Sequence, residues 1–123
     1  NFKHIGVNTK NLNLIKKSMS FVTNSPQGTA FKARIIDPKY RFGGKTGTVQ
    51  VRRISAEERE LGVKKNKDLE WHERDHALFV GYAPLSNPSY AVSVVIEHGG
   101  GGSKVAAPLA RDILLKVQKI ARP

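Results

Sequence analysis

The sequence predicts an α/β (α+β) domain in which three antiparallel strands pack with an N-terminal and a C-terminal helix. Two observations lead to this fold class. The apolar, β-branched runs 76–83 and 90–97 are separated by a short turn, which is typical of an antiparallel hairpin. Segments with helical periodicity lie near both ends of the chain, and helices laid on a sheet would complete the core. The length of 123 residues corresponds to one domain or a piece of a larger one.

The first half of the chain predicts one helix and one strand. Apolar residues recur at helical spacing at Leu12, Ile15, Met19 and Val22. Asn11 is the expected N-cap of this helix. The helix should end at the turn 24–28, because Pro26 disfavours helical backbone in the residue before it. A connecting segment over 29–40 then leads to a first strand over 41–51.

Between the first strand and the hairpin, residues 52–75 form a long charged inter-strand loop. A short helix over 56–61 is expected within it. Loops of this length are usually functional or mobile. The strand 76–83 that follows is apolar almost throughout, which suggests that both faces of the sheet are covered.

The last helix is expected over 103–122, after a flexible glycine bridge at 99–102. Pro108 belongs in the first turns of a helix, so the cap should lie between Ser103 and Ala107. The apolar positions are expected to form a single stripe: Leu109, Ala110, Ile113, Leu114, Val117, Ile120 and Ala121.

The composition limits the classes of function. The chain carries 21 basic and 10 acidic residues, a net charge of +11. This charge makes a basic module that binds nucleic acid or another anion an alternative to consider. The positive residues are spread along the chain, however, so a solvated basic surface is the preferred interpretation, and no nucleic-acid partner is expected. The absence of cysteine excludes disulfides and thiol catalysis.

A second alternative is a zinc hydrolase, because residues 72–76 fit the pattern His-Glu-x-x-His. On a helix, His72 and His76 would share a face and could bind zinc, with Glu73 as general base and Glu97 as a third ligand. The motif runs directly into a segment that reads as a strand, which argues against the necessary helix. No metal site is therefore expected.

The most informative stretch is Lys45-Thr46-Gly47-Thr48 on the first predicted strand. Alternate residues of a strand share a face, so Thr46 and Thr48 should point one way and Lys45 the other. Gly47 would let a ligand backbone approach the strand edge. Such an edge can offer a peptide-like substrate main-chain hydrogen bonds, hydroxyls and an ammonium for its carboxylate. Lys-Thr-Gly is also a motif of serine β-lactamases and penicillin-binding proteins.

Several segments, in order along the chain, resemble the C-terminal part of the transpeptidase domain of class B penicillin-binding proteins, above all the elongation-type enzymes. These segments are 19–30, 44–50, 76–84, 90–97 and 106–113. The resemblance implies a partial penicillin-binding/serine β-lactamase-like fold, with residues 1–123 as a C-terminal fragment of the transpeptidase domain. It also implies peptidoglycan D,D-transpeptidation through a serine acyl-enzyme, with no cofactor.

The resemblance implies roles for individual residues. Lys45 would organise the proton network and favour the substrate carboxylate, and Thr46 and Thr48 would offer it hydroxyls. Gly47 would keep the edge open, and the Thr48 N–H would be an oxyanion donor. The implied ligands are peptidoglycan stem peptides and β-lactams. The implied partners are the cell-wall elongation machinery, including a glycan polymerase, at the periplasmic face of the bacterial inner membrane.

The chain departs from the family in one important respect. Neither Ser-x-x-Lys, which carries the nucleophile, nor Ser-x-Asn occurs in it. The chain therefore supplies the Lys-Thr-Gly wall without the nucleophile, and it is expected to be inactive alone. Apolar surface that normally meets the missing half would be exposed, which favours oligomerisation.

Overall fold

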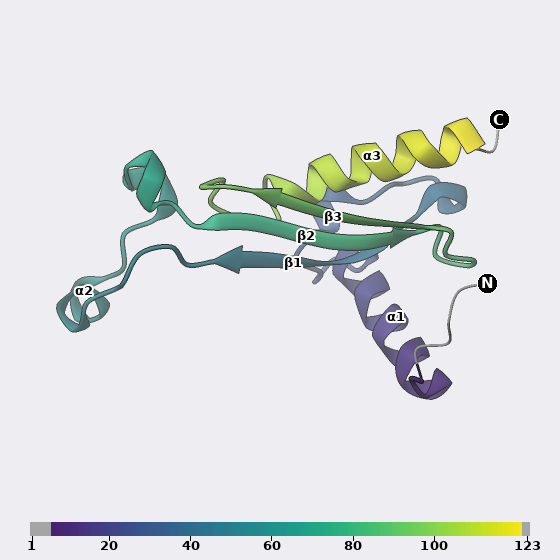
Figure 1. Ribbon diagram of the computed structural model, residues 1–123, viewed down its shortest axis with the longest axis horizontal. Helices are drawn as coiled ribbons and strands as arrows, with labels where there is room; N and C mark the ends of the chain where they lie inside the picture. Colours follow the sequence, from purple (N-terminus) through teal and green to yellow (C-terminus); the bar gives the residue numbers. More distant parts are fainter. Residues whose placement is uncertain (1–5, 122–123) are drawn as a thin grey trace.

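The computed structural model describes residues 6–121 and contains a three-stranded antiparallel sheet in the order β1-β2-β3 (Figure 1). The strands are β1 (Gly43–Val49), β2 (His76–Ala83) and β3 (Tyr90–Ile96). The predicted fold class and the bounds of β2 are confirmed. The prediction of 41–51 for β1 was too long, because pairing with the shorter β2 runs only from Gly43 to Val49. Strand β3 ends one residue before the predicted Glu97.

The first helix, α1 (Thr9–Asn24), begins earlier than predicted. Its N-cap is Asn8, whose backbone is extended and whose side chain accepts a hydrogen bond from the Lys10 N–H at 2.8 Å. The prediction of Asn11 as the cap was wrong because that residue already lies inside the first turn. The predicted end is confirmed, since Ser25 is extended ahead of Pro26.

The segment between α1 and β1 contains two short 3₁₀ turns, η1 (Phe31–Ala33) and η2 (Pro38–Tyr40). Asp37 caps the second turn by accepting from the Lys39 N–H at 2.9 Å. This connecting segment also contributes to the core, because Ala30 and Ile35 are buried.

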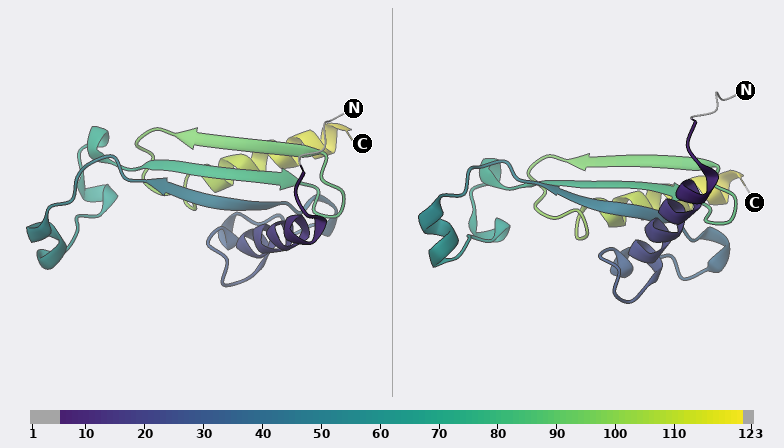
Figure 2. Two further views of the ribbon diagram at one scale, coloured as in Figure 1. Left: turned by 60° about the horizontal axis from the view of Figure 1, so that its bottom comes forward. Right: turned by 90° about the horizontal axis from the view of Figure 1, so that it is seen from below.

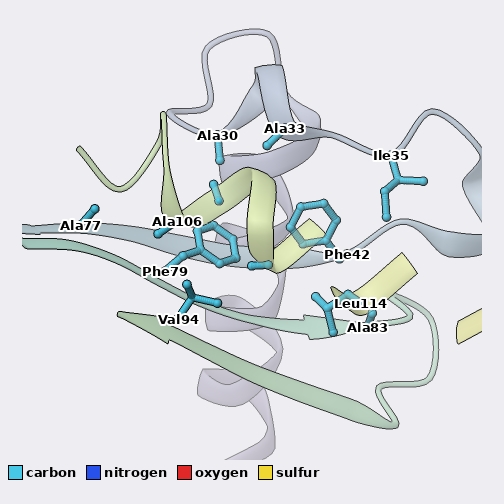
Figure 3. Close-up of a cluster of buried hydrophobic side chains, with 12 residues drawn as sticks. Ala30, Ala33, Ile35, Phe42, Ala77, Phe79, Ala83, Val94, Ala106 and Leu114 are labelled. Carbon is cyan, nitrogen blue, oxygen red and sulfur yellow. The ribbon is translucent and has the colours of Figure 1, made fainter. Parts of the chain in front are cut away.

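One face of the sheet is covered by helix α3 (Ala106–Ala121), and the core lies between them (Figure 3). Residues paired directly across antiparallel strands share a face, so Phe79 lies on the same face as Val94. The Phe79 ring meets the Phe42 ring edge-on, with centroids 5.9 Å apart. The buried cluster consists of Ala30, Ala33, Ile35, Phe42, Ala77, Phe79, Ala83, Val94, Ala106, Ala107, Ala110 and Leu114.

Helix α3 buries a face made mostly of small residues rather than the predicted apolar stripe. Its start at Ala106 confirms the cap predicted between Ser103 and Ala107. The predicted span of 103–122 was too long at its start, because 103–105 precede the helix. Arg122, the last residue of the predicted span, lies outside the described residues. Four predicted stripe positions, Leu109, Ile113, Ile120 and Ala121, are exposed. Gln118 is buried in their place because its amide donates to the Tyr40 carbonyl at 2.9 Å and to the Leu114 carbonyl at 3.2 Å.

The opposite face of the sheet is covered only in part. Helix α1 reaches it at Tyr82, whose hydroxyl donates to the Lys16 carbonyl at 2.8 Å. Val80 and Val95, on the same face as Tyr82, are 46% and 57% exposed. The prediction of cover on both faces is therefore right at Tyr82 and wrong at Val80. On α1, Phe21 is also 57% exposed. Oligomerisation through this apolar surface stays a prediction.

The long connection between β1 and β2 forms a lobe, residues 50–75, that extends beyond the end of the sheet (Figure 1). It contains helix α2 (Ala56–Leu61), as predicted, and the 3₁₀ turns η3 (Asn66–Asp68) and η4 (Trp71–Glu73). Ser55 caps α2 by accepting from the Glu58 N–H at 3.1 Å. We refer to residues 50–75 as the β1–β2 lobe.

Glu58 gives the β1–β2 lobe a defined pH dependence. It forms a two-point ion pair with Arg52 and accepts from the Lys64 N–H at 3.1 Å. The Arg52 hydrogen bond, followed by the Lys64 N–H, lowers the pKa of the Glu58 carboxyl from 4.5 to about 2. Because the pKa is lower in the folded state, the stabilisation from these contacts is fully present above pH 4.5. It is lost as the pH falls toward 2. The Lys64 amide signal should therefore shift with a midpoint near pH 2 in an NMR titration.

A Glu58→Gln variant is the control for this titration. It retains the shape of the side chain but has no titrating group, so the transition at Lys64 should disappear. A midpoint near 4.5 at Lys64 in the unaltered chain would contradict the ion pair with Arg52.

Candidate active site

The Lys-Thr-Gly segment lies on β1, which is an edge strand of the sheet (Figure 2). Strand β1 pairs with β2 along one side, and within residues 6–121 no strand pairs with its other side. Helix α1 packs against β1 near its start, whereas Lys45 and Thr48 are exposed. An unpaired edge can accept an extended peptide as an additional strand.

The side chains of the motif divide between the two faces as predicted. Thr46 pairs directly with Phe79, and Lys45 with Val80. Thr46 therefore points to the face covered by α3, together with Thr48, and Lys45 points to the partly open face. The Lys45 ammonium donates to the Thr46 carbonyl oxygen at 2.7 Å.

Both threonine hydroxyls have a partner within the chain. The Thr46 hydroxyl lies 2.9 Å from the Thr29 hydroxyl, and the Thr48 hydroxyl accepts from the Gly102 N–H at 3.5 Å. Thr29 precedes η1 and Gly102 precedes α3, so two distant segments fix the orientation of the β1 hydroxyls. The sequence prediction gave neither residue a role. The only signal was that both lie in or beside segments that resemble the family.

The glycines of β1 are explained by close packing with β2. An added Cβ would lie 2.1 Å from Phe79 Cζ at Gly44 and 2.9 Å from Tyr82 Cε1 at Gly43. At Gly47 it would lie 3.1 Å from the Leu78 Cβ. Small residues are thus needed here for β1 to pair with β2. The closer approach of a ligand backbone at Gly47 stays a prediction.

Tyr82 supports the start of β1 from the partly open face. Burial raises the pKa of its phenol, which therefore stays protonated at neutral pH. The protonated hydroxyl donates to the Lys16 carbonyl and ties α1 to the sheet. This hydrogen bond thus fixes α1 beside the start of strand β1.

The geometry removes the structural basis of the zinc alternative. Turn η4 ends at Glu73, and His76 is the first residue of β2, so His72 and His76 do not share a helix. The His76 Nδ1 atom accepts from the His98 N–H at 2.9 Å and is not free to bind a metal. No group of three metal-binding side chains is found within the described part of the chain.

Comparison with known proteins gives a family. Residues 3–115 match the model of the penicillin binding protein transpeptidase domain. The peptidoglycan D,D-transpeptidase MrdA of Haemophilus influenzae is 45% identical over 99 residues, which are 80% of this chain and 14% of that protein. The enzyme of the same name from Escherichia coli K12 is 38% identical over 106 residues, or 82% of this chain and 15% of that protein. The chain thus spans about one seventh of these relatives.

Solved structures agree with this match. Penicillin-binding protein PBP2 of Helicobacter pylori, in a complex with MreC, superposes with a TM-score of 0.72 at 28% identity, over 95% of this chain and 19% of that one. PBP2 of Pseudomonas aeruginosa, in complex with WCK 5153, has a TM-score of 0.60 at 34% identity, over 89% of this chain and 19% of that one. The resemblance inferred from the sequence is confirmed. The chain belongs to the penicillin-binding protein transpeptidase family, and the relatives named above are MrdA and PBP2 proteins.

Proposed function

We propose that this chain forms the Lys-Thr-Gly wall of the active site of a peptidoglycan D,D-transpeptidase, and that residues 1–123 are the C-terminal part of its transpeptidase domain. The observation that carries the proposal is the position of residues 45–48 on the unpaired edge of β1, within a segment that matches the transpeptidase family over residues 3–115. The nucleophile would come from another part of the polypeptide, because Ser-x-x-Lys is absent here.

The reaction proceeds in two acyl-transfer steps. The serine hydroxyl attacks the carbonyl of the D-Ala–D-Ala bond, the C–N bond breaks, and D-alanine leaves with the proton. The resulting ester is then attacked by the amine of a neighbouring stem peptide, which regenerates the serine. A β-lactam enters the first step in the same way: its carbonyl C–N bond breaks and the ring opens. The released nitrogen stays tethered to the acyl group through the rest of the molecule and cannot leave, so the adduct persists.

The residues of β1 are assigned to separate parts of this reaction. Lys45, exposed on the partly open face, attracts the substrate carboxylate and organises proton transfer at the serine. The Thr46 and Thr48 hydroxyls, on the opposite face of the strand and oriented by Thr29 and Gly102, donate to this carboxylate from the other side of the β1 edge. The Thr48 N–H stabilises the developing oxyanion. Removal of such a donor typically costs about 3–4 kcal/mol of transition-state stabilisation.

The proposed setting is the periplasmic face of the bacterial inner membrane, within the machinery that elongates the cell wall. One of the similar solved structures contains PBP2 in complex with MreC, which supports membership of such an assembly. A glycan polymerase is proposed as a further member. None of the helices between residues 6 and 121 has the length and apolar character needed to cross a bilayer.

The proposal is tested by fluorescent-penicillin labelling of this chain mixed with a separately produced segment that carries Ser-x-x-Lys and Ser-x-Asn. Labelling of the serine segment should require both pieces. The intact mass of this chain should show no penicilloyl adduct, because it has no nucleophile in a Ser-x-x-Lys motif.

Two outcomes would contradict the proposal. One is a stoichiometric adduct on this chain alone. The other is no labelling when light scattering and circular dichroism show that both pieces are folded and associated. In the second case, the basic net charge of +11 would make salt-dependent binding to nucleic acid the next property to measure.

A further inference from the structure

A cavity of about 720 Å³ lies between the β1–β2 lobe and the glycine turn that precedes α3. The lobe contributes Lys65, Asn66, Lys67 and Arg74, and the turn contributes Gly99–Gly101 and 103–105. None of the residues 45–48 lines it, so the cavity is separate from the β1 edge. Its volume is within the range of roughly 300–1,000 Å³ found for small-molecule sites.

The charge of this cavity has one sign. Lys65, Lys67, Arg74 and Lys104 line it, and no acidic residue does. None of these four side chains forms an ion pair with another residue among those described. Four positive charges around one cavity repel each other, and a bound anion would offset this repulsion. The N-terminus of the 16-residue helix α3 follows directly after the turn and adds to the positive potential.

The lobe side of the cavity is held by hydrogen bonds. The Asn66 amide donates to the Asp75 carboxylate at 2.9 Å, and the Asp75 N–H donates to the Asn66 side-chain oxygen at 2.8 Å. The Arg74 Nε donates to the Leu69 carbonyl at 3.1 Å. No hydrogen bond from the terminal guanidinium nitrogens of Arg74 is found within residues 6–121. These two nitrogens are therefore available to bind an anion.

The turn side is joined to the lobe by the Gly100 N–H, which donates to the Asp75 carbonyl at 2.8 Å. Gly100 has φ +85°, in the left-handed region that favours glycine, and an added Cβ there would lie 3.5 Å from the Asn66 Cβ. The turn and the lobe are therefore in contact beside the cavity, and Arg74 is held in place by its bond to Leu69.

We propose that this cavity binds a small polyanion, a molecule with two or more carboxylate or phosphate groups. Arg74 would bind one group with two parallel hydrogen bonds, and the lysines on both sides would neutralise the rest. The Ser103 hydroxyl, which lines the turn side, would donate a further hydrogen bond. The inference is independent of the transpeptidase assignment, since it uses no residue of the β1 edge.

The test is an NMR titration of the ¹⁵N-labelled chain at constant ionic strength, with inorganic pyrophosphate in one series and citrate in the other. Saturable shifts are expected at the amides of Asn66, Gly100 and Ser103. A Lys67→Ala/Lys104→Ala variant should bind roughly 10-fold more weakly, the effect of losing two exposed ion pairs to the anion. The series that saturates at the lower concentration identifies phosphate or carboxylate as the preferred group.

Lys116→Ala is the matched control, because it removes the same kind of charge from α3 at a position ~15 Å along the helix from its start at Ala106. It should bind as tightly as the unaltered chain. Equal weakening by Lys116→Ala, or shifts that never saturate, would show general counterion attraction and overturn the inference. The same spectra report whether each variant is folded, and either single substitution, Lys67→Ala or Lys104→Ala, replaces the double variant if it is not.

Discussion

Replacing Lys45 with alanine is expected to slow penicillin acylation of the reassembled domain by roughly 100-fold or more. A positioned proton-transfer group contributes about 10²–10⁴-fold to a rate. Lys45 is exposed on the partly open face beside the unpaired edge of β1, where its ammonium lies 2.7 Å from the Thr46 carbonyl oxygen. The second-order rate constant, from time courses of fluorescent labelling, is the quantity to compare.

The control for this substitution is Lys119→Ala, an exposed lysine in the last turn of α3. It changes the net charge equally but is remote from β1, so its acylation rate should equal that of the unaltered chain. A Lys45→Arg variant keeps the charge and changes the shape of the donor, and should recover only part of the rate. If the Lys45→Ala and Lys119→Ala variants acylate equally fast, Lys45 has no part in the reaction.

The elements with strong local patterns were predicted well. Strand β2 has the predicted bounds, and α2 occurs where it was expected. The strand pattern is unambiguous because runs of apolar and β-branched residues are bounded by clear turn signals. Helix ends were predicted less well, since Asn8 and Asn11 are equally good caps by type and only the backbone conformation selects Asn8.

Burial on α3 could not be predicted from hydrophobicity alone. Gln118 is buried and Ile120 is exposed because the Tyr40 carbonyl, far away in the sequence, lies where it can accept the amide hydrogen. Apolar side chains can be buried without any specific partner, whereas an amide side chain can be buried when its hydrogen bonds are satisfied. Which residue is satisfied depends on the tertiary contact.

For the candidate site, the sequence predicted the motif and the alternation of its side chains between the two faces of the strand. It did not predict the residues that hold the threonine hydroxyls in place. Thr46 and Lys45 lie on opposite faces as expected from a strand period of about two residues. The contact of Thr46 with Thr29 joins residues 17 positions apart, and that of Thr48 with Gly102 joins residues 54 apart. Neither contact follows from local periodicity, because both depend on how separate segments pack against β1.

Gly102 is the support whose loss should have the largest structural effect. A Cβ at this position would lie 2.3 Å from the Gly47 carbonyl oxygen and 2.4 Å from the Leu78 carbonyl oxygen. Both atoms belong to the backbone of the β1–β2 pair and cannot rotate away. Gly102→Ala should therefore lower the free energy of unfolding by about 1–3 kcal/mol or more, as overpacking does. Urea denaturation followed by circular dichroism measures this change.

Gly101→Ala is the matched control, because no atom lies within 4 Å of its added Cβ. Both substitutions reduce the freedom of the unfolded chain, which stabilises by about 0.4–1 kcal/mol. The difference between the two variants therefore isolates the steric contact of Gly102 with β1 and β2. Because that contact lies against Gly47, the acylation rate of the reassembled domain should fall with Gly102→Ala and stay unchanged with Gly101→Ala. Equal stability of the two variants would mean that the glycine turn does not support the Lys-Thr-Gly strand.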